Sequence, residues 1–381
     1  MRLLCLLLSS VLLNMPALAE SIEPPDSTEI HASGAASFRI ETVASGVTAP
    51  WSLAFLPDGK ALFVERDLGR LHMLDVDTGT LSLVTGLPEL VSSSELSAGL
   101  FDVRPHPEFV RNRQVYLAYT AGTEEALSLV MDRMVLEGTA LSQGQRLFTG
   151  QPALPAKWHF GGRIQFSGGH VYLTTGDGYE FRELSQQLDN SLGKVVRLRL
   201  DGSIPRDNPF VERPGALPEI YAYGLRNPQG MTVHPETGAV WTNEHGPQGG
   251  DEINILLPGT NYGWPVISYG EEYGGGPIGA GITHAVGMAQ PSWYWRPSIA
   301  PSGFTFYQGS AFPGWQHSVF SGALGLQHLN RLVVEEGRII HEERLLEDQE
   351  WRVRFVETGP DGYLYFGIDQ GLILRIVPAA G

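Results

Sequence analysis

The chain has 381 residues, and its 42 acidic and 26 basic side chains give a formal net charge of −16. This excess of negative charge disfavours nucleic acid and anionic membranes as partners and is compatible with cation binding. The one cysteine, Cys5, excludes a disulfide within the chain and any metal site built from paired thiols.

The first residues have the pattern of a cleaved export signal. Arg2 is followed by the apolar run Leu3–Leu13 and the small-residue site Ala17-Leu18-Ala19, as in secretory signal peptides. The apolar run is too short to span a bilayer, so a retained anchor is the less favoured alternative. We expect residues 1–19 to be a signal peptide and the mature protein to be periplasmic, without membrane insertion. Residues 20–37, rich in Ser, Pro and Glu, are expected to form a flexible leader.

From residue 38 to residue 381 one pattern returns six times. Each copy has a short apolar strand, a turn rich in Pro, Gly and Asp, and a second strand of alternating aromatic and β-branched residues, which is typical of a β-hairpin. Hairpins that recur at wide intervals indicate the blades of a propeller. The sequence therefore predicts an all-β fold, a six-bladed β-propeller of four-stranded antiparallel blades. The turns with their second strands are Leu56–Arg66, His106–Thr120, Phe166–Asp177, His234–Gly246, Phe312–Leu324 and Gly359–Asp369.

The last blade has only three clear strands of its own. The segment Phe38–Ser45 alternates like a strand and precedes the first blade. We therefore expect this segment to complete the sixth blade and to remove the open edge that would otherwise remain.

Histidine 159 is the strongest candidate for proton chemistry. In a blade, the start of the first strand and the end of the second lie at the same end, so unusual residues at these positions should meet at one mouth of the channel. His159 precedes the third first strand, and Asp177 ends the same hairpin. A neutral imidazole accepts a proton near pH 7, and a carboxylate can fix its tautomer. Gly161 and Gly162 are expected to let a ligand approach the backbone closely. The alternative is a structural histidine that satisfies a buried carbonyl.

Three arginines at the same kind of position predict an anionic ligand. Arg226 precedes the fourth first strand, and Arg352 and Arg354 flank the start of the sixth. A guanidinium matches a carboxylate in planar, bidentate fashion. The alternative is that these arginines form salt bridges with the abundant acidic residues.

The segment Glu244–Trp264 combines three acidic residues with tight turns. Hard oxygen ligands of this kind suit calcium. No EF-hand spacing, zinc motif or Gly-x-Ser-x-Gly elbow occurs in the sequence.

Seven motifs together carry a family resemblance. HFGGRI, TTGD, GLRNPQGM, NEHGPQGGDEIN, NYGWP, PSIAPSG and GPDGYLY occur in this order between about Trp51 and Val377. The sequence resembles the glucose/sorbosone dehydrogenase family, which includes aldose sugar dehydrogenases. The resemblance implies a six-bladed propeller that holds pyrroloquinoline quinone (PQQ) and calcium at the channel mouth and oxidises aldoses at C1 to the lactone, with hydride transfer to the quinone.

The resemblance also implies roles for particular residues. His159 would be the general base and Asp177 its supporting acid. A sugar would be the substrate, and electrons would leave to a separate acceptor, since the chain has no Cys-x-x-Cys-His haem motif. The implied cofactor contacts are Arg226, Asn227, Tyr273, Arg352 and Arg354, and the implied calcium ligands are the carbonyls of Gly246, Pro247 and Tyr262 and the side chain of Glu252.

Two positions depart from the family pattern. Ser97 stands where the family has a glutamine that contacts cofactor and substrate, and Gly325 stands where it has a lysine that pairs with the quinone. Loss of one such cation weakens an anionic ligand by roughly 1–3 kcal/mol. Two alternatives therefore stay open: a propeller that binds a sugar or an anion without turnover, and a calcium-dependent lactonase.

Overall fold

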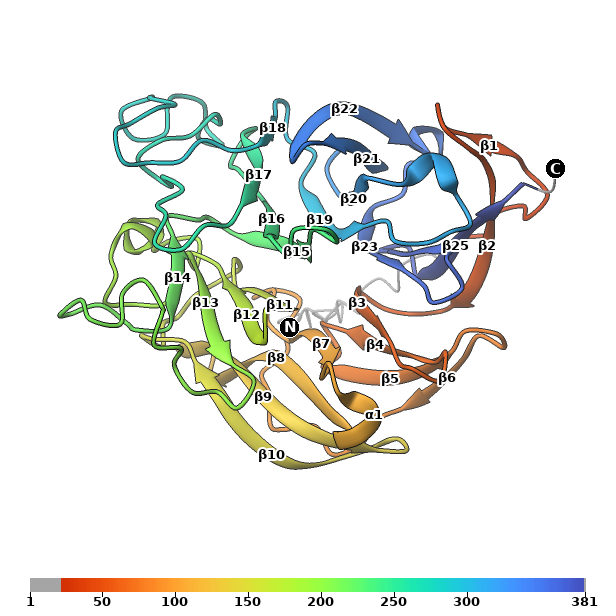
Figure 1. Ribbon diagram of the computed structural model, residues 1–381, viewed down its shortest axis with the longest axis horizontal. Coiled ribbons are helices and arrows are strands. Elements are labelled where there is room, and N and C mark those ends of the chain that lie inside the picture. Colours follow the sequence, from red (N-terminus) through yellow and green to blue (C-terminus); the bar gives the residue numbers. More distant parts are fainter. Residues whose placement is uncertain (1–21, 380–381) are drawn as a thin grey trace, which may run out of the picture.

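The computed structural model describes residues 22–379. These residues fold into six antiparallel sheets arranged around a central axis, and Figure 1 looks along this axis. The predicted six-bladed β-propeller is confirmed. The predicted signal peptide, residues 1–19, lies outside the described residues.

Each blade runs outward from an innermost strand. The innermost strands are β3 (Pro50–Phe55), β7 (Leu100–Pro105), β11 (Gly161–Ser167), β15 (Pro228–Val233), β19 (Pro301–Phe306) and β23 (Val353–Thr358). The second strands are β4 (Ala61–Glu65), β8 (Gln114–Thr123), β12 (His170–Thr175), β16 (Val240–Glu244), β20 (Ser318–Ala323) and β24 (Leu364–Ile368). The third strands are β5 (Arg70–Asp75), β9 (Ala126–Glu137), β13 (Lys194–Arg199), β17 (Asp251–Ile255), β21 (His328–Glu335) and β25 (Leu372–Pro378). The fourth strands are β6 (Thr80–Leu83), β10 (Ala140–Thr149), β14 (Ile220–Tyr223), β18 (Trp293–Trp295), β22 (Arg338–Leu345) and β2 (Ser37–Ser45).

Strand β2 closes the ring, as predicted from its alternating sequence. It pairs with β25, and Phe38 faces Pro378 while Ser45 faces Leu372. Phe38 and Ile40 are fully buried, and the Phe38 ring lies 5.7 Å from that of Trp315 in the neighbouring blade. Strands β2 and β25 therefore share one hydrophobic core.

The sixth sheet differs from the prediction because it has five strands instead of four. The extra strand is β1 (His31–Ala32), which pairs with β2. The indole Nε1 of Trp315 also donates a hydrogen bond of 3.1 Å to the Ser33 hydroxyl. The segment predicted as a flexible leader thus contributes a strand and a hydrogen bond to the folded domain.

Burial decreases outward within a blade. All five residues of β4 are buried, whereas seven of the ten residues of β10 are exposed. Each inner strand packs against a neighbouring blade on both of its faces, so its sequence is a nearly continuous run of apolar residues. Helix is scarce among the described residues: α1 (Phe109–Asn112) and the 3₁₀ turns η1 (Arg182–Gln186), η2 (Pro313–Trp315) and η3 (Glu347–Gln349). Within residues 22–379, no helix is long and apolar enough to cross a membrane.

Candidate active site

A cavity of about 290 Å³ opens at one mouth of the channel, and all six blades contribute to its wall. The convergence predicted from blade topology is confirmed by this wall. Because each blade presents the start of its first strand here, residues far apart in sequence become neighbours. The lining of this cavity includes Trp51, Arg66, Ser97, Trp158, His159, Asn227, His245, Gly325, Arg352 and Arg354.

The backbone at His159 is held in an unusual conformation. Trp158 and His159 both have left-handed φ values, 64° and 50°, which cost energy for residues with a Cβ and are typical of functional sites. The His159 carbonyl accepts a hydrogen bond of 3.2 Å from the amide of Gly178, and the Trp158 amide donates to the Leu96 carbonyl at 2.9 Å. A Cβ at position 176 would collide with the His159 carbonyl, so Gly176 is required for this arrangement.

Gly161 and Gly162 are buried and serve packing inside the protein, and neither lines the mouth cavity. A Cβ on Gly161 would collide with the backbone of Thr174 and Thr175, and one on Gly162 with the Phe101 side chain. Both glycines also have left-handed φ values. They allow β11 to enter the sheet through a bulge, which aims His159 at the mouth.

His159, Asp177 and Trp264 form a hydrogen-bonded chain. The Nδ1 atom of His159 lies 2.7 Å from Oδ1 of Asp177, and the Trp264 indole donates to Oδ2 at 2.8 Å. An ionised carboxylate only accepts hydrogen bonds, so Nδ1 carries the proton and Nε2 is the free acceptor. The predicted pairing of His159 with Asp177 is present.

Electrostatics favour a neutral His159 and an ionised Asp177. Burial lowers the pKa of His159, and the nearby Arg226 charge lowers it further. Burial opposes ionisation of Asp177, but the charge and hydrogen bond of His159 prevail, so its pKa lies below the ordinary value. Neutral imidazole therefore faces ionised carboxylate at neutral pH.

Arg226 and Asn227 are anchored by a buried glutamate. The Glu244 carboxylate accepts hydrogen bonds from the amides of Arg226, at 2.6 Å, and of Asn227, at 3.3 Å. The Arg226 guanidinium donates to the carbonyls of His245, at 3.1 Å, and Gly246, at 2.7 Å. Burial lowers the pKa of His245 to about 3, and Arg226 adds to this effect, so this second histidine at the mouth stays neutral.

Arg352 and Arg354 share one counter-ion. Both guanidinium groups bind the Asp369 carboxylate, Arg352 at 3.1 Å and Arg354 in a bidentate pair at 3.0 and 2.7 Å. Each of these two arginines is thus salt-bridged, as in the alternative weighed from sequence, and each also lines the mouth cavity. The anionic ligand stays a prediction. One carboxylate against two guanidiniums leaves positive charge facing the cavity.

A second cavity of about 650 Å³ adjoins the first and shares His245, Ala300 and Gly325 with it. Gly246, Pro247 and Tyr273 line it. Tyr273 is 61% exposed, and its hydroxyl lies 3.5 Å from the Arg226 guanidinium. The structure therefore brings these three predicted residues to the mouth.

Glu252, on β17, and Tyr262, in the connection from β17 to β18, line neither of these two cavities. Glu252 directly faces Glu244 across β16 and β17, and the Asn254 amide donates to both carboxylates, at 3.0 and 3.2 Å. Burial raises the pKa of Glu244 to about 7, and burial together with the Glu244 charge raises the pKa of Glu252. Two facing carboxylates, Glu244 buried and Glu252 partly buried, form a donor set suited to a hard cation.

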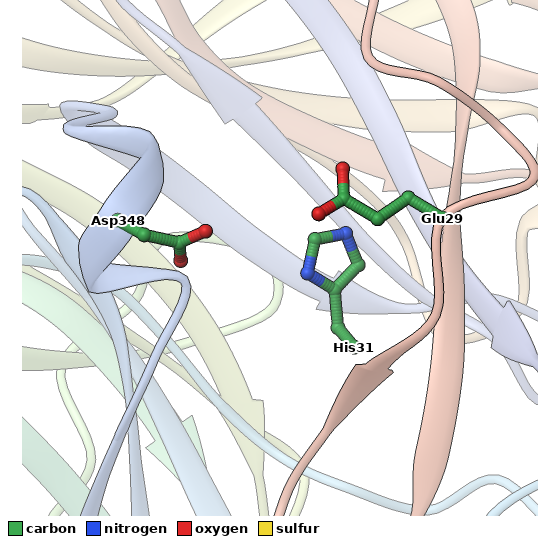
Figure 2. Close-up of side chains that lie close together, drawn as sticks. All are labelled: Glu29, His31 and Asp348. Atoms are coloured by element: carbon green, nitrogen blue, oxygen red, sulfur yellow. The ribbon is translucent and has the colours of Figure 1, made fainter.

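Another acidic group lies away from the mouth. Glu29, His31 and Asp348 place one ligand atom each within 4.8 Å of one another, between the N-terminal segment and η3 (Figure 2). Glu29 and Asp348 are exposed. Within residues 22–379 this is the one group of three such side chains, and it contains none of the predicted calcium ligands.

Sequence reasoning assigned no role to three site residues: Arg66, Trp264 and Asp369. Two of them follow the ends of second strands, Arg66 after β4 and Asp369 after β24. The positional rule that found Asp177 would have found them if applied to every blade. Trp264 sits in the long connection between β17 and β18, and no local pattern places it against Asp177.

Known proteins resemble this chain over nearly its whole length. The sequence model of the Glucose / Sorbosone dehydrogenase family matches residues 47–375. The chain is 37% identical over 354 residues to Aldose sugar dehydrogenase YliI of Escherichia coli K12. This alignment covers 90% of this chain and 94% of YliI. A solved glucose dehydrogenase superposes with a TM-score of 0.85 at 41% identity, covering 90% of this chain and 99% of that one. The PQQ-bound aldose sugar dehydrogenase of Streptomyces coelicolor superposes with a TM-score of 0.73 at 26% identity, covering 93% and 99%. The chain therefore belongs to the glucose/sorbosone dehydrogenase family of oxidoreductases.

Proposed function

We propose that this protein oxidises the C1 hydroxyl of aldose sugars to the lactone, with PQQ and calcium as cofactors and His159 as the general base. The observation that carries the proposal is the His159–Asp177–Trp264 chain at a mouth lined by arginines. It provides a proton acceptor and an anion site in one cavity. The family membership, the aldose sugar dehydrogenase relative and the PQQ-bound neighbour support the same conclusion.

His159 takes the proton of the sugar's C1 hydroxyl on its Nε2 atom. Asp177 holds Nδ1 as the hydrogen-bond donor at 2.7 Å and stabilises the imidazolium that forms. Trp264 fixes the other oxygen of this carboxylate. When bound, PQQ supplies the electron acceptor, an ortho-quinone that takes up the hydrogen leaving C1 with its electron pair.

The residues at the mouth fit a carboxylated cofactor. Arg352 and Arg354 share the single Asp369 carboxylate, and the Arg226 Nε atom is buried without a hydrogen-bond partner. PQQ carries three carboxylates, and guanidinium groups bind carboxylates in bidentate fashion. We propose that Arg226, Asn227, Tyr273, Arg352 and Arg354 hold it.

The facing carboxylates of the fourth blade fit calcium. The side-chain oxygen of Asn254 is buried there without a partner, beside Glu244 and Glu252. Buried acceptors without donors are rare, and a divalent cation would satisfy all three groups. We propose that Glu252 and the Tyr262 carbonyl bind calcium at this position, and that the carbonyls of Gly246 and Pro247 bind it at the mouth. The Gly246 carbonyl accepts a hydrogen bond from Arg226, so a cation there would have to displace this guanidinium.

A second candidate is a propeller that binds an anion or a sugar without turnover. The observation that favours it is that both family departures, Ser97 and Gly325, line the mouth cavity. A calcium-dependent lactonase is less compatible with the arginines, because a lactone is neutral.

One titration separates these functions. Purified protein is mixed with PQQ and calcium while the quinone absorbance is followed, and an aldose is then added. We expect a spectral change on binding and a second change, to reduced PQQ, on sugar addition. No spectral change at micromolar PQQ would exclude the dehydrogenase, and binding without reduction would favour the non-catalytic propeller. Calcium-dependent lactone hydrolysis without PQQ would identify the lactonase.

We further propose that residues 1–19 are removed on export, that the protein works in the periplasm, and that a separate acceptor removes the electrons. The absorbance change of reduced PQQ, followed after adding candidate acceptors, identifies the acceptor.

A further inference from the structure

Arg66 is an unassigned cation in the wall of the mouth cavity. It follows β4 in the first blade, and its side chain is only 10% exposed. It lines the same 290 Å³ cavity as His159, Arg352 and Arg354. The Arg66 amide donates to the Ala49 carbonyl at 3.2 Å, which fixes the backbone at the end of the strand.

The Arg66 guanidinium is stacked on an aromatic ring that Arg354 also contacts. Its Cζ atom lies 3.8 Å from the centroid of the Trp51 ring, and that of Arg354 lies 4.3 Å from the same centroid. Cation–π contacts of this kind orient a guanidinium at low entropic cost. Two arginines are therefore held on one indole, and both line the cavity.

Within the described residues, only two carboxylates pair with the three arginines in this wall, Arg66, Arg352 and Arg354. Arg66 pairs with Asp67 at 2.5 Å, whereas Asp369 serves both Arg352 and Arg354. Burial lowers the pKa of Arg66, and the Arg354 charge adds to this effect. Clustered, buried guanidiniums with few carboxylates are stabilised by a bound anion.

Arg66 lies in the same cavity wall as the two residues that depart from the family pattern. Ser97 and Gly325 line the cavity with it, and neither carries a charge. A Cβ at position 99 would collide with the Arg66 carbonyl, so Gly99, two residues after Ser97, lets this segment pack directly on Arg66. The wall that lacks the family lysine and glutamine thus has a buried arginine in it.

We propose that Arg66 is a further binding residue for the anionic cofactor and supplies positive charge in a site that lacks the lysine at position 325. This inference rests on the proposed PQQ dependence. Trp51 acts as the platform that holds Arg66 and Arg354 in place.

The test compares two substitutions at one position. Arg66→Met keeps an unbranched side chain against Trp51 and removes the charge, and Arg66→Lys keeps the charge. PQQ affinity is measured by tryptophan fluorescence quenching in calcium. We expect Arg66→Met to raise the PQQ dissociation constant about 10-fold or more, as for loss of a charge-assisted hydrogen bond. Arg66→Lys should raise it less, and the salt dependence of binding should be weaker in Arg66→Met.

The control variant is Arg111→Met. Arg111 lies on α1, between β7 and β8 and so at the opposite end of the propeller, and its side chain is 78% exposed. This substitution should leave PQQ affinity unchanged. Thermal unfolding of each apo variant reports whether Arg66 serves only the fold.

The outcomes distinguish the two proposals. If the wild-type protein does not bind PQQ, the proposed function fails and this inference fails with it. If the wild type binds and Arg66→Met binds equally well, only the inference is overturned. It is also overturned if both Arg66 variants lose affinity equally and unfold at equally lowered temperatures, because Arg66 would then act through the fold alone.

Discussion

His159 is distinguished from an ordinary buried histidine by what surrounds its two nitrogens. Asp177 fixes Nδ1 as a donor, and Trp264 fixes Asp177. The backbone of His159 is held in the left-handed region by contacts with Gly178 and Gly176. A histidine that only satisfied a buried carbonyl would need neither the strained backbone nor the Trp264 indole bound to Asp177.

Replacing the base should separate turnover from cofactor binding. His159→Gln keeps polar volume but cannot accept a proton near neutral pH, so kcat should fall by about 10²–10⁴-fold, the usual contribution of a general base. The dissociation constant of PQQ should change little. Steady-state kinetics with a dye acceptor and a binding titration measure the two quantities.

Arg352→Ala should show the opposite behaviour to His159→Gln. Its affinity for PQQ should be weaker, and excess PQQ should partly restore its activity. Normal turnover in His159→Gln would disprove the assignment of the base.

The pH dependence of kcat/KM should follow the His159 imidazole. Only the neutral form accepts a proton, and burial and Arg226 lower its pKa. Activity should therefore be constant near pH 7 and fall on the acid side with a midpoint below the ordinary histidine value of about 6.5. In Asp177→Asn the midpoint should move to still lower pH, because the carboxylate charge that raises the His159 pKa is lost.

The residual activity of His159→Gln should lack this acid limb. An identical limb in that variant would show that another group titrates.

At the scale of elements, the site is built from strand ends. Each first strand begins, and each second strand finishes, at the mouth, so blades 1, 3, 4 and 6 supply Arg66, Asp177, Glu244 and Asp369 from the last residue of a second strand or the two residues after it. The strands are rigid supports for these charged residues. All six first strands enter their sheets through a register shift, and in β11 the shift contains two glycines with left-handed φ values, next to His159.

Ring closure by β2 should be a major contribution to stability. Phe38→Ala removes a fully buried ring that packs on Trp315, and such changes typically cost about 3–5 kcal/mol. The midpoint of chemical denaturation should therefore fall clearly. Val110→Ala, at a site that is 71% exposed, is the control and should have almost no effect. Equal stability of the two variants would mean that β2 does not hold the ring closed.

For the whole molecule, calcium should act as a stabilising ligand. A ligand that binds only the folded state adds about 2.7 kcal/mol at 100 times its dissociation constant, so calcium should raise the unfolding temperature by several degrees. Glu252→Gln should remove this response, because it takes away one of two facing carboxylates. Differential scanning calorimetry with and without chelator measures the effect.

Asp348→Asn is the control for the exposed group of Figure 2 and should respond to calcium like the wild type. Loss of the response in Asp348→Asn alone would place the calcium at that group instead.

The sequence by itself determined the parts of this protein that depend on local pattern. Period-two strands and turn residues specify each hairpin from within about a dozen residues, so the six blades, the closing strand Phe38–Ser45 and the pair of His159 with Asp177 on one hairpin were all predictable. Only the tertiary structure decided which residues from different blades meet. Trp264 reaches Asp177 across 87 residues of chain, and Arg66 and Arg354 share Trp51 because the ring closes. Such contacts follow from the circular arrangement of the blades, and no short-range pattern in the sequence predicts that arrangement of contacts.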